Sequence, residues 1–163
     1  MELTDEKLGK LKKFVREEYS RIGSMRCPLF NEKIFFSSEG FNHLIYKGKD
    51  NKKKRPKSEQ YIRLKLFKLA CKLLQCTRTY QDYFATRHWI KRNINKRKDE
   101  TLKDVEYWGI LAIIDNRRIK VVIKQYSNGN KKFWGVCPKW HTQKNPHTFE
   151  EKIINYAGDL EGE

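Results

Sequence analysis

The feature that most constrains the fold is the pattern of residues 107–138, where apolar strands alternate with short turns. YWGILAIID is a nearly continuous apolar run, which is typical of a central strand buried on both faces. DNRR then supplies a turn, IKVVIKQY predicts the next strand, and the Asn-Gly pair in SNGN suits a tight hairpin. KKFWGVC predicts a third strand, which Pro138 ends. We therefore expect an antiparallel three-stranded meander.

Helical spacing dominates the N-terminal half of the chain. Residues 5–22 place apolar side chains at helical intervals, and Thr4 is suited to cap that helix. A second helix, with a strong apolar face, is expected from Ser58, as its cap, to residue 76. Residues 78–95 are expected to be helical at their start, and the charged residues after them to form a loop up to residue 106.

The segment between these two helices predicts less regular structure. Residues 34–36 indicate a short strand, and Gly40 suggests a tight bend before a second apolar segment at residues 41–46. The basic residues 47–57 predict a mobile surface loop, whose KKKRPK run also resembles a nuclear-import signal. Near the C-terminus, Thr148 is expected to start a short helix that reaches residue 160, with Glu151 completing its capping box.

The order of these elements predicts an α+β fold, with N-terminal helices packed on a C-terminal antiparallel β-meander and a short C-terminal helix. We expect residues 1–24 to form an N-terminal helical extension. Residues 25–163 are expected to form a single α+β domain, since a chain of 163 residues can bury a substantial core.

The net charge of the chain indicates what kind of partner it binds. The chain carries 36 Lys and Arg residues against 20 Asp and Glu residues, a net charge of +16, which favours binding to a polyanion such as nucleic acid. No apolar run reaches membrane-spanning length, and the N-terminus lacks a signal-peptide core, so we expect a cytoplasmic protein without a membrane partner. The four cysteines show no CxxC pair and suit free thiols. Cys137 and His141 could form half of a zinc site, but a second half is missing, so no metal or other cofactor is expected.

The residue types favour one kind of nuclease chemistry over another. A metal-dependent nuclease needs clustered carboxylates, and a restriction-type core would place one at Val122, two residues before Lys124. A metal-independent ribonuclease instead uses the 2′-OH of RNA as nucleophile and needs an acid, a base and cations. Lys, Arg and His are abundant here, which favours the second chemistry.

Four histidines are candidates for proton transfer. His43 lies between apolar residues in FNHLIYKGK, a context in which a lone histidine is more often a core or turn residue. His88 stands beside Trp89 in a basic stretch and could lie at the surface or stack on RNA. His141 and His147 follow the last strand of the meander.

Alternation divides the strand IKVVIKQY between two faces. Ile119, Val121 and Ile123 fall on one face, whereas Lys120, Val122, Lys124 and Tyr126 fall on the other. On the return strand, the same rule groups Lys132 with Trp134. A face that carries Lys, Tyr and Trp could contact phosphates and stack on bases. Lysines that protect a strand edge from aggregation would give the same pattern, and this feature alone leaves both interpretations open.

GFNHLIYKG, the helix that begins SEQYIRLKLFKLA, and WGILAIIDNRRIKVVIKQYSNGNKKFWGVCP together resemble a phage- and mobile-element-associated family. That family reads H-[LIV]-x-[YF]-K-G, then R-x-x-x-[FL] on a helix, then [LIV]-K-[VI]-[VI]-[IV]-[RK]-Q-x-x-N-G-x-x-x-F-[WY]-S. It is similar to the barnase, EndoU, colicin and RelE (BECR) superfamily of metal-independent ribonucleases, which are small α+β domains. The resemblance covers residues 40 to about 138.

The resemblance implies roles at the matching positions. His43 would act as general acid or base, Lys124 would contact the scissile phosphate, and Arg63 would add a phosphate contact. Gln125 and Asn128 would position the turn. One departure stands out, because this chain has Gly135 where the family pattern has Ser after the aromatic pair. Any role of that hydroxyl is therefore missing here.

We therefore expect a toxin-like or effector endoribonuclease that cleaves RNA by 2′-OH transesterification without a metal. The expected catalytic residues are His43, Lys124 and Arg63. The expected RNA-binding residues are Lys47, Lys120, Gln125, Tyr126, Asn128, Lys132 and Trp134. An antitoxin or an effector-complex protein is a further expected partner. The alternatives are a non-catalytic RNA- or DNA-binding subunit of a larger nucleoprotein effector complex and a metal-dependent DNase.

Overall fold

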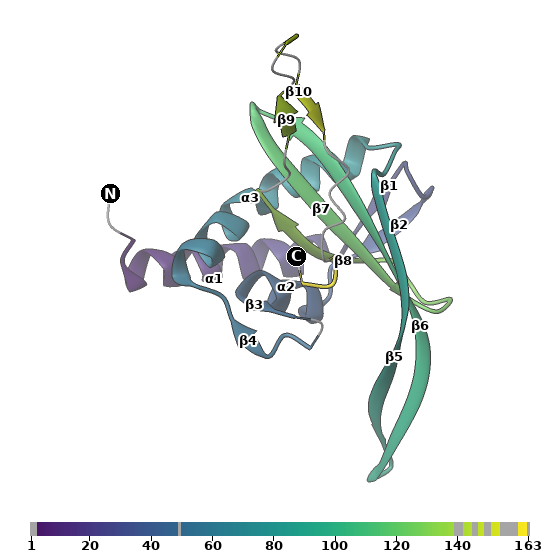
Figure 1. Ribbon diagram of the computed structural model, residues 1–163. Coiled ribbons are helices and arrows are strands. Elements are labelled where there is room, and N and C mark those ends of the chain that lie inside the picture. The colour runs from purple at the N-terminus through teal and green to yellow at the C-terminus, as the bar shows by residue number, and fades with distance from the viewer. Residues whose placement is uncertain are drawn as a thin grey trace.

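A computed structural model describes residues 3–48, 50–138, 142–144, 147–148, 151–153 and 160–162. Within these ranges the chain forms three helices and a mostly antiparallel six-stranded sheet (Figure 1), which confirms the expected α+β class. The helices are α1 (Asp5–Ile22), α2 (Ser38–Ile45) and α3 (Lys57–Cys76). The strands are β1 (Ser24–Cys27), β2 (Glu32–Phe35), β3 (Tyr46–Lys47), β4 (Lys53–Lys54), β5 (Asp82–Ile94), β6 (Arg97–Ile114), β7 (Arg117–Tyr126), β8 (Lys132–Cys137), β9 (Thr142–Lys144) and β10 (Glu151–Ile153).

The large sheet has the order β1-β2-β8-β7-β6-β5. Strands β6, β7 and β8 form the expected antiparallel meander. Asp115 and Asn116 form the two-residue turn between β6 and β7, and both have positive φ angles, as this tight hairpin turn requires. The sheet is nevertheless not purely C-terminal, because β1 and β2 lie between α1 and α2 in the chain. The short strand expected at residues 34–36 overlaps β2, which begins at Glu32 and ends at Phe35.

The helices bury the apolar face of the meander. Figure 1 shows α1 and α3 together on one side of the sheet. Ile119, Val121 and Ile123 point into the main core on this side, as the alternation of β7 predicted. Tyr19 of α1 lies at the centre of that core, with its ring 5.4 Å from Phe67 of α3. Helix α1 therefore contributes to the same core as the sheet.

Helix α2 lies against the edge of β8. A Cβ atom on Gly40 would come within 2.1 Å of the Phe133 carbonyl oxygen, so only glycine permits this approach. The bend predicted at Gly40 is therefore wrong, because the residue lies inside a helix and its small size serves packing. On either side of this contact, Leu44 reaches the main core while His43 reaches the opposite face of the sheet.

The helix expected at the start of residues 78–95 and the loop expected at residues 95–106 are both wrong. These residues form the hairpin of β5 and β6, which pairs continuously from Asp82↔Gly109 to Ile94↔Arg97. Much of this hairpin is exposed on both faces, so its residues do not alternate between apolar and polar as a half-buried strand does. The pattern therefore lacked the usual signal for strands.

Two further details differ from expectation. Pro56 occupies the N-cap of α3, so the helix begins at Lys57 and Ser58 lies in its first turn. Residues 151–153 form β10, which pairs with β9, instead of the first turn of a C-terminal helix. The rest of that expected helix, residues 154–159, lies outside the described residues. The cap predicted at Thr4 is confirmed by its hydrogen bond from the Lys7 amide.

None of the four cysteines forms a disulfide. In the described part of the chain, no helix is both long enough and apolar enough to cross a membrane.

Candidate nucleic-acid groove and its buried polar network

Lys124 is the centre of a polar cluster on the face of the sheet opposite the main core. The residue is only 1% exposed, and its ammonium nitrogen lies 3.7 Å from the centroid of the Trp134 ring and 4.5 Å from that of Tyr126. Nζ donates a hydrogen bond of 3.0 Å to Oε1 of Glu39 in α2. The same oxygen accepts from the Tyr126 hydroxyl. One carboxylate therefore holds both the cation and the phenol.

Opposing effects set the charge states in this cluster. Burial alone would raise the pKa of Glu39, but the charge of Lys124 and the hydrogen bond from Tyr126 outweigh it and hold this pKa below its usual value. Burial lowers the pKa of Lys124, although Glu39 counteracts that effect. Glu39 is thus a stable carboxylate at neutral pH.

His43 is fully buried behind Trp134. The two rings stack with their centroids 3.9 Å apart, and Lys124 must lie over the other ring face because the imidazole covers this one. Arg55 donates from Nη2 to Nε2 of His43, so Nδ1 carries the proton and donates to Oδ1 of Asn51 at 2.7 Å. Burial lowers the pKa of His43 to about 3. His43 is therefore a neutral histidine with both nitrogens engaged.

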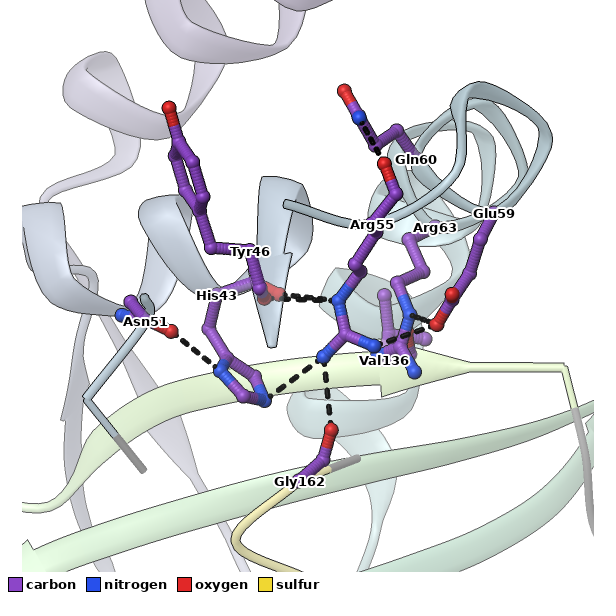
Figure 2. A network of polar contacts seen from close by, with 9 residues as sticks. All are labelled: His43, Tyr46, Asn51, Arg55, Glu59, Gln60, Arg63, Val136 and Gly162. Carbon is purple, nitrogen blue, oxygen red and sulfur yellow. Dashed lines mark hydrogen bonds and ion pairs between the residues drawn. The ribbon is translucent and has the colours of Figure 1, made fainter. Parts of the chain in front are cut away.

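The neighbouring arginines satisfy backbone carbonyl groups (Figure 2). Arg55 donates from Nε to the carbonyl oxygens of His43 and Tyr46, and from Nη2 to that of Gly162. Arg63 donates to the Val136 carbonyl oxygen on the edge of β8 that faces α3. Both guanidinium groups also contact Glu59 and are buried. In this arrangement the two arginines hold the network together.

The C-terminal residues cover part of the same face. Leu160 packs in a small second core with Tyr107, Val122 and Trp134. The indole nitrogen of Trp134 donates to the Glu161 carbonyl oxygen. The Glu161 carboxylate lies 2.7 Å from Nε2 of His88 on β5. His88 is thereby fixed against the body of the protein.

A groove of about 580 Å³ opens between this cluster and the β5–β6 hairpin. Its lining residues are Glu39, Asp50, Asn51, Lys52, Arg87, His88, Trp89, Ile90, Lys91, Lys124 and Tyr126. An adjoining hollow of about 400 Å³ shares Glu39, Ile90 and Tyr126 with it. Its other lining residues are Arg92, Lys103, Gly129, Asn130 and Lys132. We refer to both spaces together as the groove. It combines a fixed carboxylate, a histidine and several cations.

The structure brings some of the predicted site residues to the groove and places others elsewhere. Lys124, Tyr126 and Lys132 line it. Trp134 is covered on both ring faces, which leaves no face for a base. Lys120 is buried and ion-paired with Asp82 at 3.3 Å.

The remaining predicted residues lie around the margins. Gln125 donates to the Gly129 carbonyl oxygen in the turn that follows β7. Asn128 is exposed in that turn, and half-buried Lys47 lies in β3. His147 is exposed, and His141 lies outside the described residues. In the described ranges, no three His, Cys, Asp or Glu residues gather as metal ligands would.

The sequence reading missed Glu39, Asn51 and Arg55, and it gave His88 only a minor role. Glu39 stands in the first turn of α2, where an acidic residue has the ordinary explanation of favouring the helix dipole. A buried Lys on β7 does signal that a carboxylate must lie nearby, because buried charges are paired. That signal predicts a partner but does not identify it.

Comparisons with protein-family models, with curated proteins and with solved structures found no match to this chain. Its function must therefore be argued from the geometry of the groove.

Proposed function

We propose that the protein is a metal-independent endoribonuclease that cleaves RNA in the groove by 2′-OH transesterification. The observation that carries the proposal is that Glu39, His88 and Lys124 line one groove. These are the three kinds of group that the reaction needs, namely a base, an acid and a cation beside the phosphate. The resemblance of the chain to the BECR superfamily points to the same chemistry.

Glu39 suits the role of general base. Both of its hydrogen bonds engage Oε1, so within the described part of the chain Oε2 is the oxygen without a hydrogen bond. Its lowered pKa keeps it deprotonated near neutral pH. In the proposed step, Glu39 accepts the proton of the 2′-OH while the 2′-oxygen bonds to phosphorus.

His88 suits the role of general acid. Glu161 holds Nε2, which leaves Nδ1 as the nitrogen that can exchange a proton with a substrate. The imidazolium form gives its proton to the departing 5′-oxygen as the P–O5′ bond breaks. The products are a 2′,3′-cyclic phosphate and a 5′-hydroxyl, and Lys124 and Lys132 stabilise the negative charge that develops on the phosphorane.

This assignment gives new roles to two of the residues expected from the resemblance. His43 is neutral and hydrogen-bonded at both nitrogens, and Arg63 is bonded to the Val136 carbonyl oxygen and Glu59. We assign them to the support of Trp134 and β8, while Lys124 keeps its expected role at the phosphate.

The test is cleavage of labelled single-stranded RNA in the presence of a chelator, with analysis of the new ends. We expect cyclic-phosphate fragments from the wild type. Loss of a general base or acid reduces the rate by roughly 10²- to 10⁴-fold, and we expect reductions of that size in Glu39→Gln and His88→Gln.

Glu32→Gln is the matched control. Glu32 forms the equivalent ion pair with Lys131, at 3.2 Å, away from the groove. We expect this variant to cleave at the wild-type rate. Salt-sensitive binding without cyclic-phosphate fragments would reject the enzyme and favour the non-catalytic RNA-binding protein. Cleavage that appears only with added magnesium would reject the proposed mechanism.

A further inference from the structure

The β5–β6 hairpin extends beyond the sheet as a two-stranded ribbon whose base contacts the rest of the protein through His88 and Glu161. Strand β6 pairs with β7 only from Val105 onward, whereas its pairing with β5 continues to Arg97. Residues 87–104, which we call the arm, therefore pair only with one another within the sheet. Figure 1 shows the arm projecting well away from the helices. At ~3.3 Å per residue, its eight paired positions on β5 span roughly 26 Å.

One face of the arm continues the wall of the groove. His88 and Ile90 line the groove, and alternation along β5 places Arg92 on their side of the ribbon. In the register of the hairpin, Lys103 lies opposite His88, and Arg97 lies opposite residue 94, so both share this face. We call it the groove face. Arg92 and Lys103 also line the groove directly.

The cations on the two faces of the arm differ in their partners. The arm carries seven Lys and Arg residues against three Asp and Glu residues. On the outer face, Arg87 pairs with Asp104 and Lys91 pairs with Glu100, and both cations also border the groove at the base of the arm. Among the described residues, the groove-face cations Arg92, Arg97 and Lys103 have no ion-pair partner. Asp99, opposite Arg92, is the one carboxylate among the arm residues of this face, so the groove face presents three cations and a net positive charge from the groove to the tip.

We propose that this face of the arm holds the phosphate backbone of single-stranded RNA that runs on from the groove. The inference rests on the proposed function and adds its substrate class, which is single-stranded RNA extending several nucleotides beyond the cleaved bond. Proteins that bind single strands combine a positively charged track with aromatic side chains, and Tyr126 stands where the arm meets the groove. An RNA duplex also presents phosphates to cations, so the test below compares the two forms of RNA directly.

The test is the affinity for 2′-O-methyl RNA, which lacks the nucleophile and cannot be cleaved by transesterification. Two lengths of about 4 and about 16 nucleotides cover the range of single-strand binding sites. We expect Arg92→Gln/Arg97→Gln/Lys103→Gln to weaken binding of the longer RNA about tenfold or more and to leave the shorter one nearly unchanged. The slope of log affinity against log salt should fall by roughly 2, at ~0.7 for each lost phosphate contact.

The control removes two cations of the same arm that do not line the groove, in Lys96→Gln/Lys98→Gln. We expect this variant to keep most of the preference for longer RNA. Equal losses in the groove-face variant and the control, or a longer-RNA preference that survives in the groove-face variant, would overturn the proposal. Tighter binding to a duplex than to a single strand would also overturn it. The proposed function fails separately, if the wild type leaves unmodified RNA intact.

Discussion

The protein contains two lysines that are each held by a glutamate over aromatic rings, one on either face of the sheet. Lys124 lies over Trp134 and Tyr126 and contacts Glu39. Lys131 lies 5.0 Å from the ring centroid of Phe30 and 5.4 Å from that of Trp108, and it contacts Glu32. Chemically the two clusters are nearly equivalent, with a cation, a carboxylate and aromatic rings in each.

What separates the two clusters is their surroundings. Glu39 is half-buried and lines the groove beside His88, whereas Glu32 is exposed and does not line the groove. Lys131 can therefore be explained as a structural clip that joins β2 to the start of β8. A buried ion pair adds little stability compared with apolar packing, so the Lys124 cluster has no comparable structural explanation. Because only one of these two similar ion pairs lines the groove, it is the groove, and not the ion pair itself, that indicates a functional role.

The largest difference in stability between the two clusters should come from replacing the lysine in each. Lys124→Met leaves the Glu39 carboxylate without its cation. We expect this variant to reduce the free energy of unfolding by about 2–3 kcal/mol. This is less than the ~3–5 kcal/mol for a fully buried pair, because Glu39 reaches water in the groove. Lys131→Met leaves Glu32 in solvent and should cost less than about 1 kcal/mol. Urea denaturation measures both.

A second change distinguishes pairing from packing. Glu39→Gln/Lys124→Met removes both charges, and we expect it to recover most of the stability lost in Lys124→Met while RNA cleavage stays absent. Equal costs for the two lysine variants, or full RNA cleavage by Lys124→Met, would show that the two clusters have the same structural role.

The fold could be predicted wherever burial imposes a pattern. The meander was found because Ile119, Val121 and Ile123 alternate with residues of the other face. The arm was missed because it has water on both faces, so no alternation is required and its charged residues resemble a loop. A β-bulge next to Ile123, between β7 and β8, also shifts the pleat. Phe133 and Val136 therefore share the main core, which simple alternation on β8 does not predict.

The site could be predicted only in part, for a related reason. Lys124 and Tyr126 were found because they lie on a strand with a regular period. Glu39 meets them across 85 residues of sequence, through the close approach of α2 to β8 that Gly40 permits. His43 was correctly singled out as a residue of interest, but no sequence pattern indicates that Asn51 and Arg55 engage both of its nitrogens.

A smaller effect on stability should come from His43, whose ring stacks on Trp134 in the Lys124 cluster. In the folded protein burial depresses the pKa of His43 to about 3 from a usual value of 6.5, so the unfolded chain binds a proton that the folded protein excludes. Stability is therefore fully present above pH 6.5 and falls as the pH drops toward 3. Between pH 7 and pH 5 we expect this residue to account for a loss of about 2 kcal/mol.

Urea denaturation at both pH values, in the wild type and in His43→Gln, measures this contribution. The variant should lose about 2 kcal/mol less than the wild type over the interval, whatever its stability at pH 7. The same pH response in both proteins would mean that His43 is accessible to protons. That result would return it to consideration as a catalytic residue.

The smallest effect should come from Tyr126→Phe, which removes a single hydrogen bond from the Glu39 carboxylate. We expect a stability loss of about 1 kcal/mol, the usual contribution of such a bond. The bond also helps to hold the pKa of Glu39 low, so its loss should raise that pKa. If Glu39 is the general base, it must be ionised to act, and the acidic limb of the pH–rate profile should move to higher pH in the variant.

The control for this prediction lies on the hairpin itself. Tyr83 donates an equivalent hydrogen bond to Glu106, a carboxylate outside the residues of the groove. Tyr83→Phe should therefore leave the acidic limb in place. An unchanged limb in Tyr126→Phe as well would separate the carboxylate from the chemistry, because a base that titrates in the rate profile must respond to the loss of its hydrogen-bond donor. The Lys124 cluster would then bind RNA through its cation alone, and the proton acceptor would have to be sought elsewhere along the groove.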